Sequence, residues 1–216
     1  MSYTLYTIAG APRPWRVALG LVAKGLPFTS VVLEASKQEQ KAPAFLAINP
    51  RGRTPVLADG DFVLTESIAI LAYLERAHPA PALFGTTTAE HARIWEQAMS
   101  AEHHLREATG ALVPPLFAGK ATDLVAQAGR VLEELERFEV QLGRTAFLCT
   151  ETMSAADCVA FPDVRLVLRA TERSPEVCQS LGLHPFASRL PRTQRWLDRI
   201  EALPGYGDTF PAHWRK

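Results

Sequence analysis

The stretch of sequence that decides the fold is Asn49-Pro50-Arg51-Gly52-Arg53-Thr54-Pro55-Val56-Leu57. Pro55 stands at the start of an expected short strand, where the missing backbone N–H costs least. A cis bond between Thr54 and Pro55 is compatible with this position, because X-Pro bonds adopt the cis form more readily than other peptide bonds do. A cis bond there would turn the N–H and C=O of Thr54 outward, where they can pair with a peptide ligand as a neighbouring strand does. The alternative is a plain turn that enters an edge strand.

A second motif follows shortly after the first, and it reads Leu64-Thr65-Glu66-Ser67-Ile68-Ala69-Ile70. Ser67 stands at the start of an amphipathic helix, where the first N–H groups are unpaired and the helix dipole is positive. That end of a helix can hold a ligand carboxylate. Glu66 beside it can bind a ligand ammonium group, so the pair is suited to the amino-acid end of a small molecule. The alternative is an N-cap serine next to a solvated glutamate.

The elements around these motifs alternate between strand and helix in the order βαβαββα. The expected strands are Tyr3 to Ile8, Phe28 to Leu33, Pro55 to Ala58 and Phe62 to Leu64, and the expected helices are a first one ending at Gly25, a short one from Lys41 to Ala47, and one from Thr65 to His78. A βαβ unit has parallel strands and a right-handed crossover, and the Asp59-Gly60 turn favours an antiparallel pair. The sequence therefore predicts a small mixed sheet with a thioredoxin-like arrangement.

After this part the chain shows almost no strand pattern. A linker over residues 81–88 separates an expected mixed domain, residues 1–80, from an expected helical domain, residues 89–216. Apolar residues from Leu124 to Leu142 recur at steps of four and three, which is typical of one face of a helix. Ser154 and Asp157 form an S-x-x-D capping box that predicts a helix start. The expected fold class is therefore α/β followed by all-α.

Composition excludes several classes of protein. The 216 residues include 23 basic and 23 acidic side chains, and so give no electrostatic reason to expect a nucleic acid or an anionic membrane as partner. The first ten residues lack the pattern of a signal peptide, and no apolar run is long enough to cross a bilayer. Three cysteines without a CxxC pair favour a reducing compartment, so we expect a cytoplasmic protein. The histidines show no metal-binding spacing, so we expect no metal.

The combination of N-P-x-G-x-T-P-V-L with E-S-I-A-I-L-A-Y-L at this spacing resembles the glutathione transferase superfamily, and the resemblance covers essentially the whole chain. It implies glutathione as co-substrate, a small hydrophobic electrophile as second substrate, and a homodimer. It also implies that Glu66 and Ser67 hold the γ-glutamyl end of glutathione. Thr54, before the cis-proline Pro55, would pair with the cysteinyl backbone of the ligand.

The resemblance leaves several candidates for the glycyl carboxylate of glutathione. Lys41 lies nine residues before Pro50, an offset similar to that of the omega class, in which a lysine meets this carboxylate. Arg51 and Arg53 are competing candidates on the same loop. Each of these side chains can also be simply solvated.

The residue that activates the thiol of glutathione in this superfamily is missing. Trp15-Arg16-Val17 resembles the zeta class, and alignment on it places Ala11 where the catalytic serine stands, with Pro12 and Arg13 at the next two signature positions. The omega-class cysteine also falls on Ala11. A guanidinium near the thiolate would lower the thiol pKa by its charge, which makes Arg13 a candidate activator. The other candidates are Tyr6 and Thr7, which point to opposite faces at the end of the first strand.

The superfamily places its second substrate between the two domains, and Trp95 and His104 are candidates for contacts with it. The leading hypothesis is an enzyme that transfers the thiol of glutathione to small hydrophobic electrophiles or peroxides. A non-catalytic glutathione-binding carrier is the first alternative, since Ala11 lacks an activating group. A glutathione-dependent isomerase is the second, favoured by Trp15-Arg16-Val17.

Overall fold

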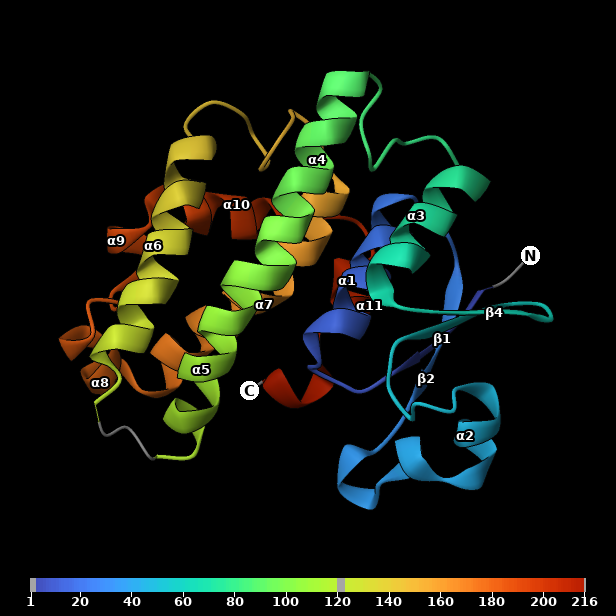
Figure 1. Cartoon of the computed structure of the whole chain (residues 1–216). Coiled ribbons are helices and arrows are strands. Elements are labelled where there is room, and N and C mark those ends of the chain that lie inside the picture. Colours follow the sequence, from blue (N-terminus) through green and yellow to red (C-terminus); the bar gives the residue numbers. More distant parts are fainter. Residues whose placement is uncertain (1–2, 120–122, 216) are drawn as a thin grey trace. The chain divides into compact units, whose positions relative to one another are not determined.

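The structure is a computed structural model that describes residues 3–119 and 123–215. The chain divides into two compact units, one formed by Met1–Phe84 with Leu203–Lys216 and the other by Gly85–Ala202. Figure 1 colours the elements of both units by their position in the sequence, from blue at the N-terminus to red at the C-terminus.

The first unit is built on a four-stranded sheet with the order β2-β1-β3-β4 (Figure 1). The strands are β1 (Tyr3–Thr7), β2 (Phe28–Val32), β3 (Val56–Asp59) and β4 (Phe62–Thr65). β1 pairs with β2 in parallel and with β3 antiparallel, and β3 pairs with β4 antiparallel. The predicted mixed sheet and its strand directions are therefore confirmed.

One face of this sheet is covered by α1 (Pro12–Ala23) and α3 (Ser67–Ala77), which pack against each other. Gly20 allows this close approach, because a Cβ there would lie 2.3 Å from a Leu71 methyl carbon. Leu5, whose side chain is 1% exposed, belongs to the core of this unit. β1, the strand that contains Leu5, ends at Thr7, shortly before α1 begins at Pro12, so the start of that helix follows the carboxyl end of a central strand.

Shorter helical segments lie between β2 and β3. They are two 3₁₀ turns, Ala35–Lys37 and Glu39–Lys41, and the helix α2 (Pro43–Ile48). α2 lies on the opposite side of the sheet from α3 in Figure 1, and the ring of Phe45 is 5.8 Å from the ring of Tyr6. Tyr6 therefore points to the α2 face, as alternation along β1 requires.

The end of the chain also belongs to the first unit, whereas the sequence pattern groups it with the helical domain. It contains α11 (Tyr206–Thr209) and the 3₁₀ turn Ala212–Trp214. Trp15 of α1 donates from Nε1 to Thr209 Oγ1 at 3.0 Å, and its ring lies 5.4 Å from that of Trp214. Aromatic packing on α1 is thus the physical reason for this grouping.

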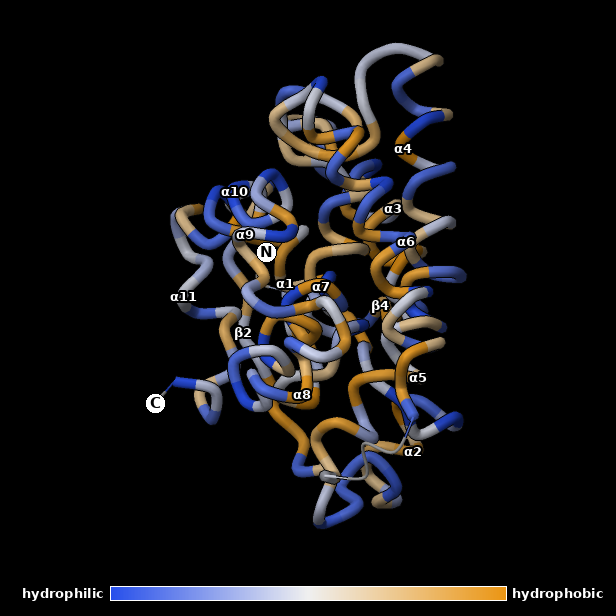
Figure 2. Tube along the Cα trace, turned by 90° about the vertical axis from the view of Figure 1, so that its left-hand side faces the viewer, coloured by the Kyte–Doolittle hydropathy of each residue, from blue (hydrophilic) through white to orange (hydrophobic). Residues whose placement is uncertain are grey.

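The second unit is helical. Its helices are α4 (Thr88–Ser100), a π-helical turn Ala101–Leu105, α5 (Arg106–Phe117), α6 (Val125–Gln141), α7 (Ala155–Arg173), α8 (Pro175–Ser180), α9 (Phe186–Arg189) and α10 (Pro191–Glu201). The trace of α4 changes between hydrophilic and hydrophobic residues within each turn, as expected for a helix with one buried face (Figure 2). The predicted all-helical second part is confirmed.

Details of the helical unit agree with the sequence patterns in most places. The stripe on α6 is buried at Val131, Leu135 and Phe138. The capping box at Ser154 is present, with the Asp157 carboxylate accepting from the Ser154 backbone N–H at 2.8 Å. α8 and α9 are not predicted by the sequence analysis, because six and four residues are too few to display a helical stripe.

In the described residues no helix is both long and apolar enough to span a bilayer. Within the same residues no group of three or more histidine, cysteine or acidic side chains is arranged to hold a metal ion. Cys149, Cys158 and Cys178 are all free thiols.

Candidate functional site

A pocket of about 210 Å³ in the first unit brings the two sequence motifs together. Its walls come from the N-terminus of α1, the loop before β3, the end of β4 and the start of α3. The lining residues are Arg13, Asn49, Arg51, Arg53, Thr54, Pro55, Thr65, Glu66 and Ser67. Residues from three separate stretches of the chain therefore meet at one pocket.

The loop before β3 is held in place by Asn49, whose side chain is nearly buried. Its Nδ2 donates to the Arg53 carbonyl at 2.7 Å, and its Oδ1 accepts from the Arg51 backbone N–H at 3.1 Å. Gly52 has a φ of +56° and lies so close to the Gln40 carbonyl that a Cβ would be 2.6 Å from that oxygen. The loop therefore requires both residues to present Arg51, Arg53 and Thr54 to the pocket.

The peptide bond between Thr54 and Pro55 is cis, which is one of the two alternatives that the first motif leaves open. Thr54 is half-buried, and Pro55 is buried immediately before the core residue Val56. Both residues belong to the pocket lining. The backbone of Thr54 is thus part of the wall along which an extended peptide can lie.

The start of α3 forms the opposite wall. Glu66 is the N-cap residue with φ +68°, a region that residues other than glycine rarely adopt, and Ser67 begins the helix. Ser67 therefore starts the helix, as the second motif predicts, although the expected helical range of Thr65 to His78 begins two residues earlier. Ser67 is 5% exposed, and its Oγ accepts from Arg16 Nη1 at 3.4 Å. The hydroxyl therefore lies at the inner end of the pocket rather than in open solvent.

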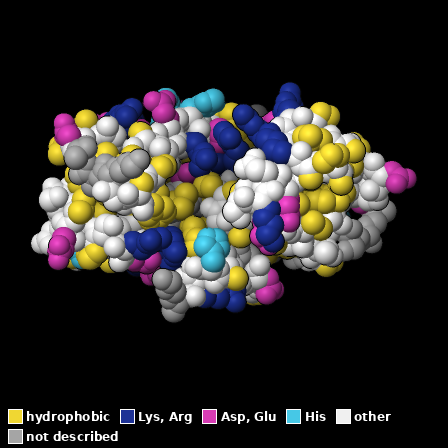
Figure 3. All heavy atoms as spheres, turned by 90° about the horizontal axis from the view of Figure 1, so that it is seen from below, with side chains coloured by type: hydrophobic (Ala, Val, Ile, Leu, Met, Phe, Trp, Pro, Cys, Tyr) yellow, Lys and Arg dark blue, Asp and Glu magenta, His cyan; other side chains and the backbone are white. Residues whose placement is uncertain are grey.

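Charge in the pocket is dominated by arginine. Arg13, Arg51 and Arg53 line it together with a single carboxylate, Glu66, whose oxygen is 3.7 Å from Arg51 Nη1. This excess is local, since Lys and Arg side chains lie beside Asp and Glu side chains on the face drawn in Figure 3 and the formal net charge of the chain is zero. The pocket is therefore suited to an anionic ligand that also carries one ammonium group for Glu66.

The other predicted site residues of the first unit lie outside this lining. Lys41 donates from Nζ to the Arg51 carbonyl at 3.1 Å, so it supports the loop from behind. Ala11 is the N-cap residue of α1, and its N–H donates to the Ile8 carbonyl at 3.0 Å. Tyr6 and Thr7 lie in β1, with Tyr6 against Phe45. Among the described candidates for thiol activation, only Arg13 lines the pocket.

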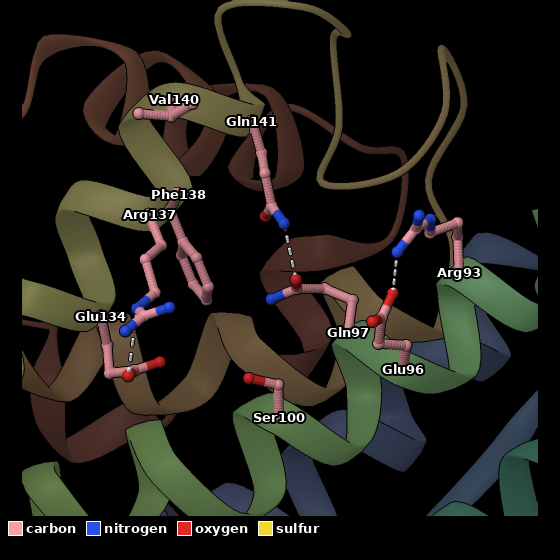
Figure 4. A pocket seen from close by; sticks show the side chains of 9 residues that line it. All are labelled: Arg93, Glu96, Gln97, Ser100, Glu134, Arg137, Phe138, Val140 and Gln141. Atoms are coloured by element: carbon pink, nitrogen blue, oxygen red, sulfur yellow. Dashed lines mark hydrogen bonds and ion pairs between the residues drawn. The ribbon is translucent and has the colours of Figure 1, made fainter.

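The helical unit contains a larger pocket of about 400 Å³ between α4 and α6 (Figure 4). Its charged side chains are paired with each other: Arg93 with Glu96, and Arg137 with Glu134 at 3.6 Å. Gln141 donates to Gln97 across the pocket at 2.8 Å. Because its charged side chains are paired with each other, this pocket is less suited to a charged ligand than the smaller one in the first unit.

The candidates for a second-substrate contact are both in the helical unit. The Trp95 ring lies 6.4 Å from the His91 ring. His104 is exposed and lines a pocket of about 140 Å³ whose other lining residues are mostly charged. This polar lining of the His104 pocket offers little apolar surface to a hydrophobic electrophile.

Sequence reasoning does not single out two residues that the pocket needs. Asn49 stands inside the first motif, and its signal is an Asn-Pro step before a glycine turn, which favours side-chain bonds to the local backbone. Arg16 is fully buried beside Ser67, although an arginine within a helix is normally expected to be exposed. The sequence feature that could have indicated its burial is its position between the apolar residues Trp15 and Val17.

The fold and the pocket together define a protein with a thioredoxin-like unit, a helical unit, and a pocket whose lining is rich in arginine. The family model described as "Glutathione S-transferase, N-terminal domain" matches residues 1–76, and the model described as "Glutathione S-transferase, C-terminal domain" matches residues 87–204. The chain belongs to the glutathione S-transferase family. The family predicted from the two motifs is thus confirmed.

Individual relatives agree with this assignment. Glutathione S-transferase F10 of Arabidopsis thaliana is 31% identical over 156 residues, which are 68% of this chain and 73% of that protein. A maleylacetoacetate isomerase of Pseudomonas aeruginosa is 27% identical over 97% of this chain and 96% of its own length. The crystal structure of a glutathione S-transferase from the Antarctic clam Laternula elliptica matches with a TM-score of 0.83 at 26% identity, over 100% of this chain and 95% of that one.

Proposed function

We propose that the protein is a glutathione transferase that binds glutathione in the pocket of the first unit and transfers its thiol to a small hydrophobic electrophile or a peroxide. The observation that carries this proposal is the meeting of Glu66, Ser67, Thr54 and three arginines in one pocket. Each charged group of glutathione has a counterpart there. Ser67 and the N–H groups at the start of α3 can donate to the γ-glutamyl carboxylate. Glu66 can bind the ammonium group, and an arginine can bind the glycyl carboxylate.

The thiol of glutathione requires activation, because the thiolate is the nucleophile and a cysteine-like thiol is mostly protonated at neutral pH. Ala11 offers no side-chain donor at the start of α1, and neither Pro12 nor Pro14 has a backbone N–H. Arg13 stands between the two prolines and lines the pocket. We assign it the stabilisation of the thiolate by charge, with its backbone N–H as a second donor.

Calorimetry with glutathione and a rate assay with chlorodinitrobenzene test this function together. We expect saturable binding and measurable conjugation by the native chain. Arg13→Ala should lower the rate with little loss of affinity, whereas Glu66→Gln should lower the affinity. A folded protein that gives no saturable heat with millimolar glutathione would contradict the proposal.

A non-catalytic glutathione carrier is the second candidate, and Ala11 at the N-cap of α1 favours it. Retention on immobilised glutathione without turnover of several electrophiles would support the carrier. Ala11→Ser restores a hydroxyl at the position that an activating serine occupies in the zeta class. A rate that rises in Ala11→Ser would show that activation, and not binding, limits the natural chain.

A glutathione-dependent isomerase is the third candidate. It is favoured by the maleylacetoacetate isomerase relative and by the Trp15-Arg16-Val17 tripeptide. An assay of cis-trans isomerisation of maleylacetoacetate in the presence of glutathione separates this activity from conjugation. Isomerisation without conjugation would replace the first candidate by this one.

The remaining parts of the proposal concern partners and location. We retain Trp95 and His104 as candidate contacts of the second substrate, and their replacement by alanine should change electrophile preference without changing glutathione affinity. We infer a homodimer in the cytoplasm. Phe62 and Val63 on the edge strand β4 support a dimer, because their side chains are 50% and 42% exposed. Light scattering on Phe62→Ser and on the native chain tests the dimer.

A further inference from the structure

We propose that Arg16 is a positioning residue of the glutathione site, which acts through the Ser67 hydroxyl to favour the γ-glutamyl carboxylate. This inference rests on the function proposed above. It assigns a role to the part of Trp15-Arg16-Val17 that family resemblance leaves without one. Arg16 itself does not line the pocket, and its effect on a ligand is transmitted by Ser67 and by its charge.

The location of Arg16 is the first observation. Its side chain is 0% exposed, between the buried residues Trp15 and Val17 of α1. A charge that is removed from water costs several kcal/mol unless polar partners compensate it, so a buried arginine of this kind is uncommon. The packing of α1 against α3 places its guanidinium directly behind Ser67, with Nη1 3.4 Å from Oγ. The charge therefore lies behind the wall of the pocket.

The hydrogen bond between these two residues fixes the direction of the Ser67 hydroxyl. A guanidinium nitrogen can only donate, and a hydroxyl has one hydrogen and two acceptor lone pairs. Since Ser67 Oγ accepts from Arg16 on its inner side, its single O–H remains available for an acceptor on the pocket side. A carboxylate is the acceptor that profits most, because charge-assisted hydrogen bonds are about twice as strong as neutral ones.

The charge of Arg16 adds to this effect. The N-terminus of α3 is already positive from the helix dipole, and Arg16 places a full positive charge behind it in a region shielded from water. Both contributions favour an anion at the start of α3. Neither favours the ammonium group of the ligand, which Glu66 attracts from its exposed position at the pocket edge.

Lys24, the C-cap residue of α1, provides a comparison at the other end of that helix. Its side chain is also 0% exposed, but its Nζ lies 2.7 Å from a Glu75 carboxylate oxygen and donates to the His78 and Pro81 carbonyls at 2.6 and 2.8 Å. Lys24 thus joins α1 to the end of α3 and the segment after it, away from the pocket. It is a buried cation with a structural role, and it serves as the matched control for Arg16.

The experiment compares two ligands in four proteins. Calorimetry measures Kd for glutathione and for γ-aminobutyryl-cysteinylglycine, which is glutathione without its α-carboxylate. The proteins are the native chain, Arg16→Met, Arg16→Gln and Lys24→Met. Circular dichroism confirms that each is folded at the temperature of the titration. The quantity of interest is the ratio of the two Kd values, which cancels any general loss of the site.

We expect the native chain to bind glutathione more tightly than the analogue by at least about tenfold, or about 1.4 kcal/mol. In Arg16→Met and Arg16→Gln this ratio should fall close to one, because glutathione affinity drops while analogue affinity stays nearly constant. Lys24→Met should lower the unfolding temperature and keep the native ratio.

Three outcomes would overturn the proposal. If an Arg16 variant raises the Kd values of both ligands by the same factor, Arg16 has a structural role only. A ratio that falls equally in Lys24→Met would show that buried charge on α1 acts without Ser67. If neither Arg16 variant folds, a native chain that binds the analogue as tightly as glutathione still refutes the inference. Absence of glutathione binding by the native chain would instead refute the proposed function.

Discussion

The buried carboxylate of Asp157 should be the most sensitive single position in the helical unit. It is fully buried and accepts hydrogen bonds from the Leu148 N–H, the Ser154 N–H, the Ser154 hydroxyl and the Trp196 indole N–H, at 2.7 to 2.9 Å. It therefore does more than cap α7, because it also joins α7 to α10 and to the preceding loop. Its replacement tests whether this network, rather than the cap alone, stabilises the unit.

The magnitude follows from counting donors that lose their acceptor. Asp157→Ala leaves three buried N–H groups unpaired, each of which costs about 1–3 kcal/mol, so the total is about 3–9 kcal/mol. Asp157→Asn can keep its oxygen toward Leu148 and Trp196, and its NH₂ group then faces the Ser154 N–H. One orphaned donor and weaker neutral hydrogen bonds give a loss of about 2–3 kcal/mol. Since whole domains are stable by only about 5–15 kcal/mol, Asp157→Ala should come close to unfolding the unit.

Glu90 provides the matched control within the same unit. It forms a second capping box with Thr87, and its carboxylate also accepts from Thr86, but these groups are exposed. Water can replace the lost acceptor in Glu90→Gln, so its loss of stability should be clearly smaller than that of Asp157→Asn. Urea unfolding followed by circular dichroism, with equal m-values, measures both. A loss in Asp157→Asn no larger than in Glu90→Gln would refute the reasoning.

The two carboxyls should also differ in pH dependence. Burial raises the pKa of Asp157 from its ordinary value of 3.8. The stability that this shift contributes to folding is fully present below pH 3.8 and is lost as the pH rises through the pKa of the folded state. Hydrogen bonds, first from the Thr86 backbone N–H, lower the pKa of Glu90 from 4.5. Its contribution is present above pH 4.5 and is lost as pH falls through the lowered pKa. The stability difference between native and Asp157→Asn should therefore shrink with rising pH, and that for Glu90→Gln should grow.

Three further outcomes are expected. Gly10→Ala should lower the free energy of unfolding by about 1–3 kcal/mol, because φ is +78° and a Cβ would lie 3.2 Å from an indole carbon. Gly25→Ala, with φ +63° and nothing within 4 Å of the added Cβ, gives the cost of the backbone conformation alone. Urea unfolding measures both variants. Burial raises the pKa of Cys149 to about 12, so that roughly 1 thiol in 10,000 is ionised at pH 8. A maleimide should therefore label it slowly until urea exposes all three cysteines. Lys24→Met should cost about 3 kcal/mol by breaking a buried ion pair, and the added change Glu75→Gln should recover part of it.

Much of the fold is predictable because the relevant signals are local. The stripe repeats along the 17 residues of α6, and Val131, Leu135 and Phe138 are buried as that period requires. The helical range alone begins two residues before Ser67, the start that the second motif predicts, because Thr65 still pairs in β4 and Glu66 takes a positive φ. A backbone turn of this kind leaves no mark in hydrophobic periodicity. Short helices such as α9 are likewise fixed by packing and not by a pattern of their own.

The candidate site divides in the same way. Thr54, Glu66 and Ser67 are predictable because each motif carries its own local chemistry. Arg16 is not, since it stands 51 positions from Ser67 and reaches it only through the packing of α1 on α3. The grouping of the chain end with the first unit is equally non-local, because Trp214 meets a tryptophan that lies near the beginning of the chain. Long-range packing is thus what sequence patterns leave open at this site.

The start of α1 is the part of the pocket where the ligand thiol would be activated under the proposed function. Ala11 contributes no donor, and the prolines on both sides of Arg13 remove two of the backbone N–H groups that a helix normally presents at its first turn. Under the proposed function, activation of a thiol at this end relies on Arg13, whereas affinity relies on the loop before β3 and on the start of α3. Because these parts belong to different segments, substitution at position 13 should separate rate from affinity. A chain in which the two always change together would have to activate its ligand elsewhere.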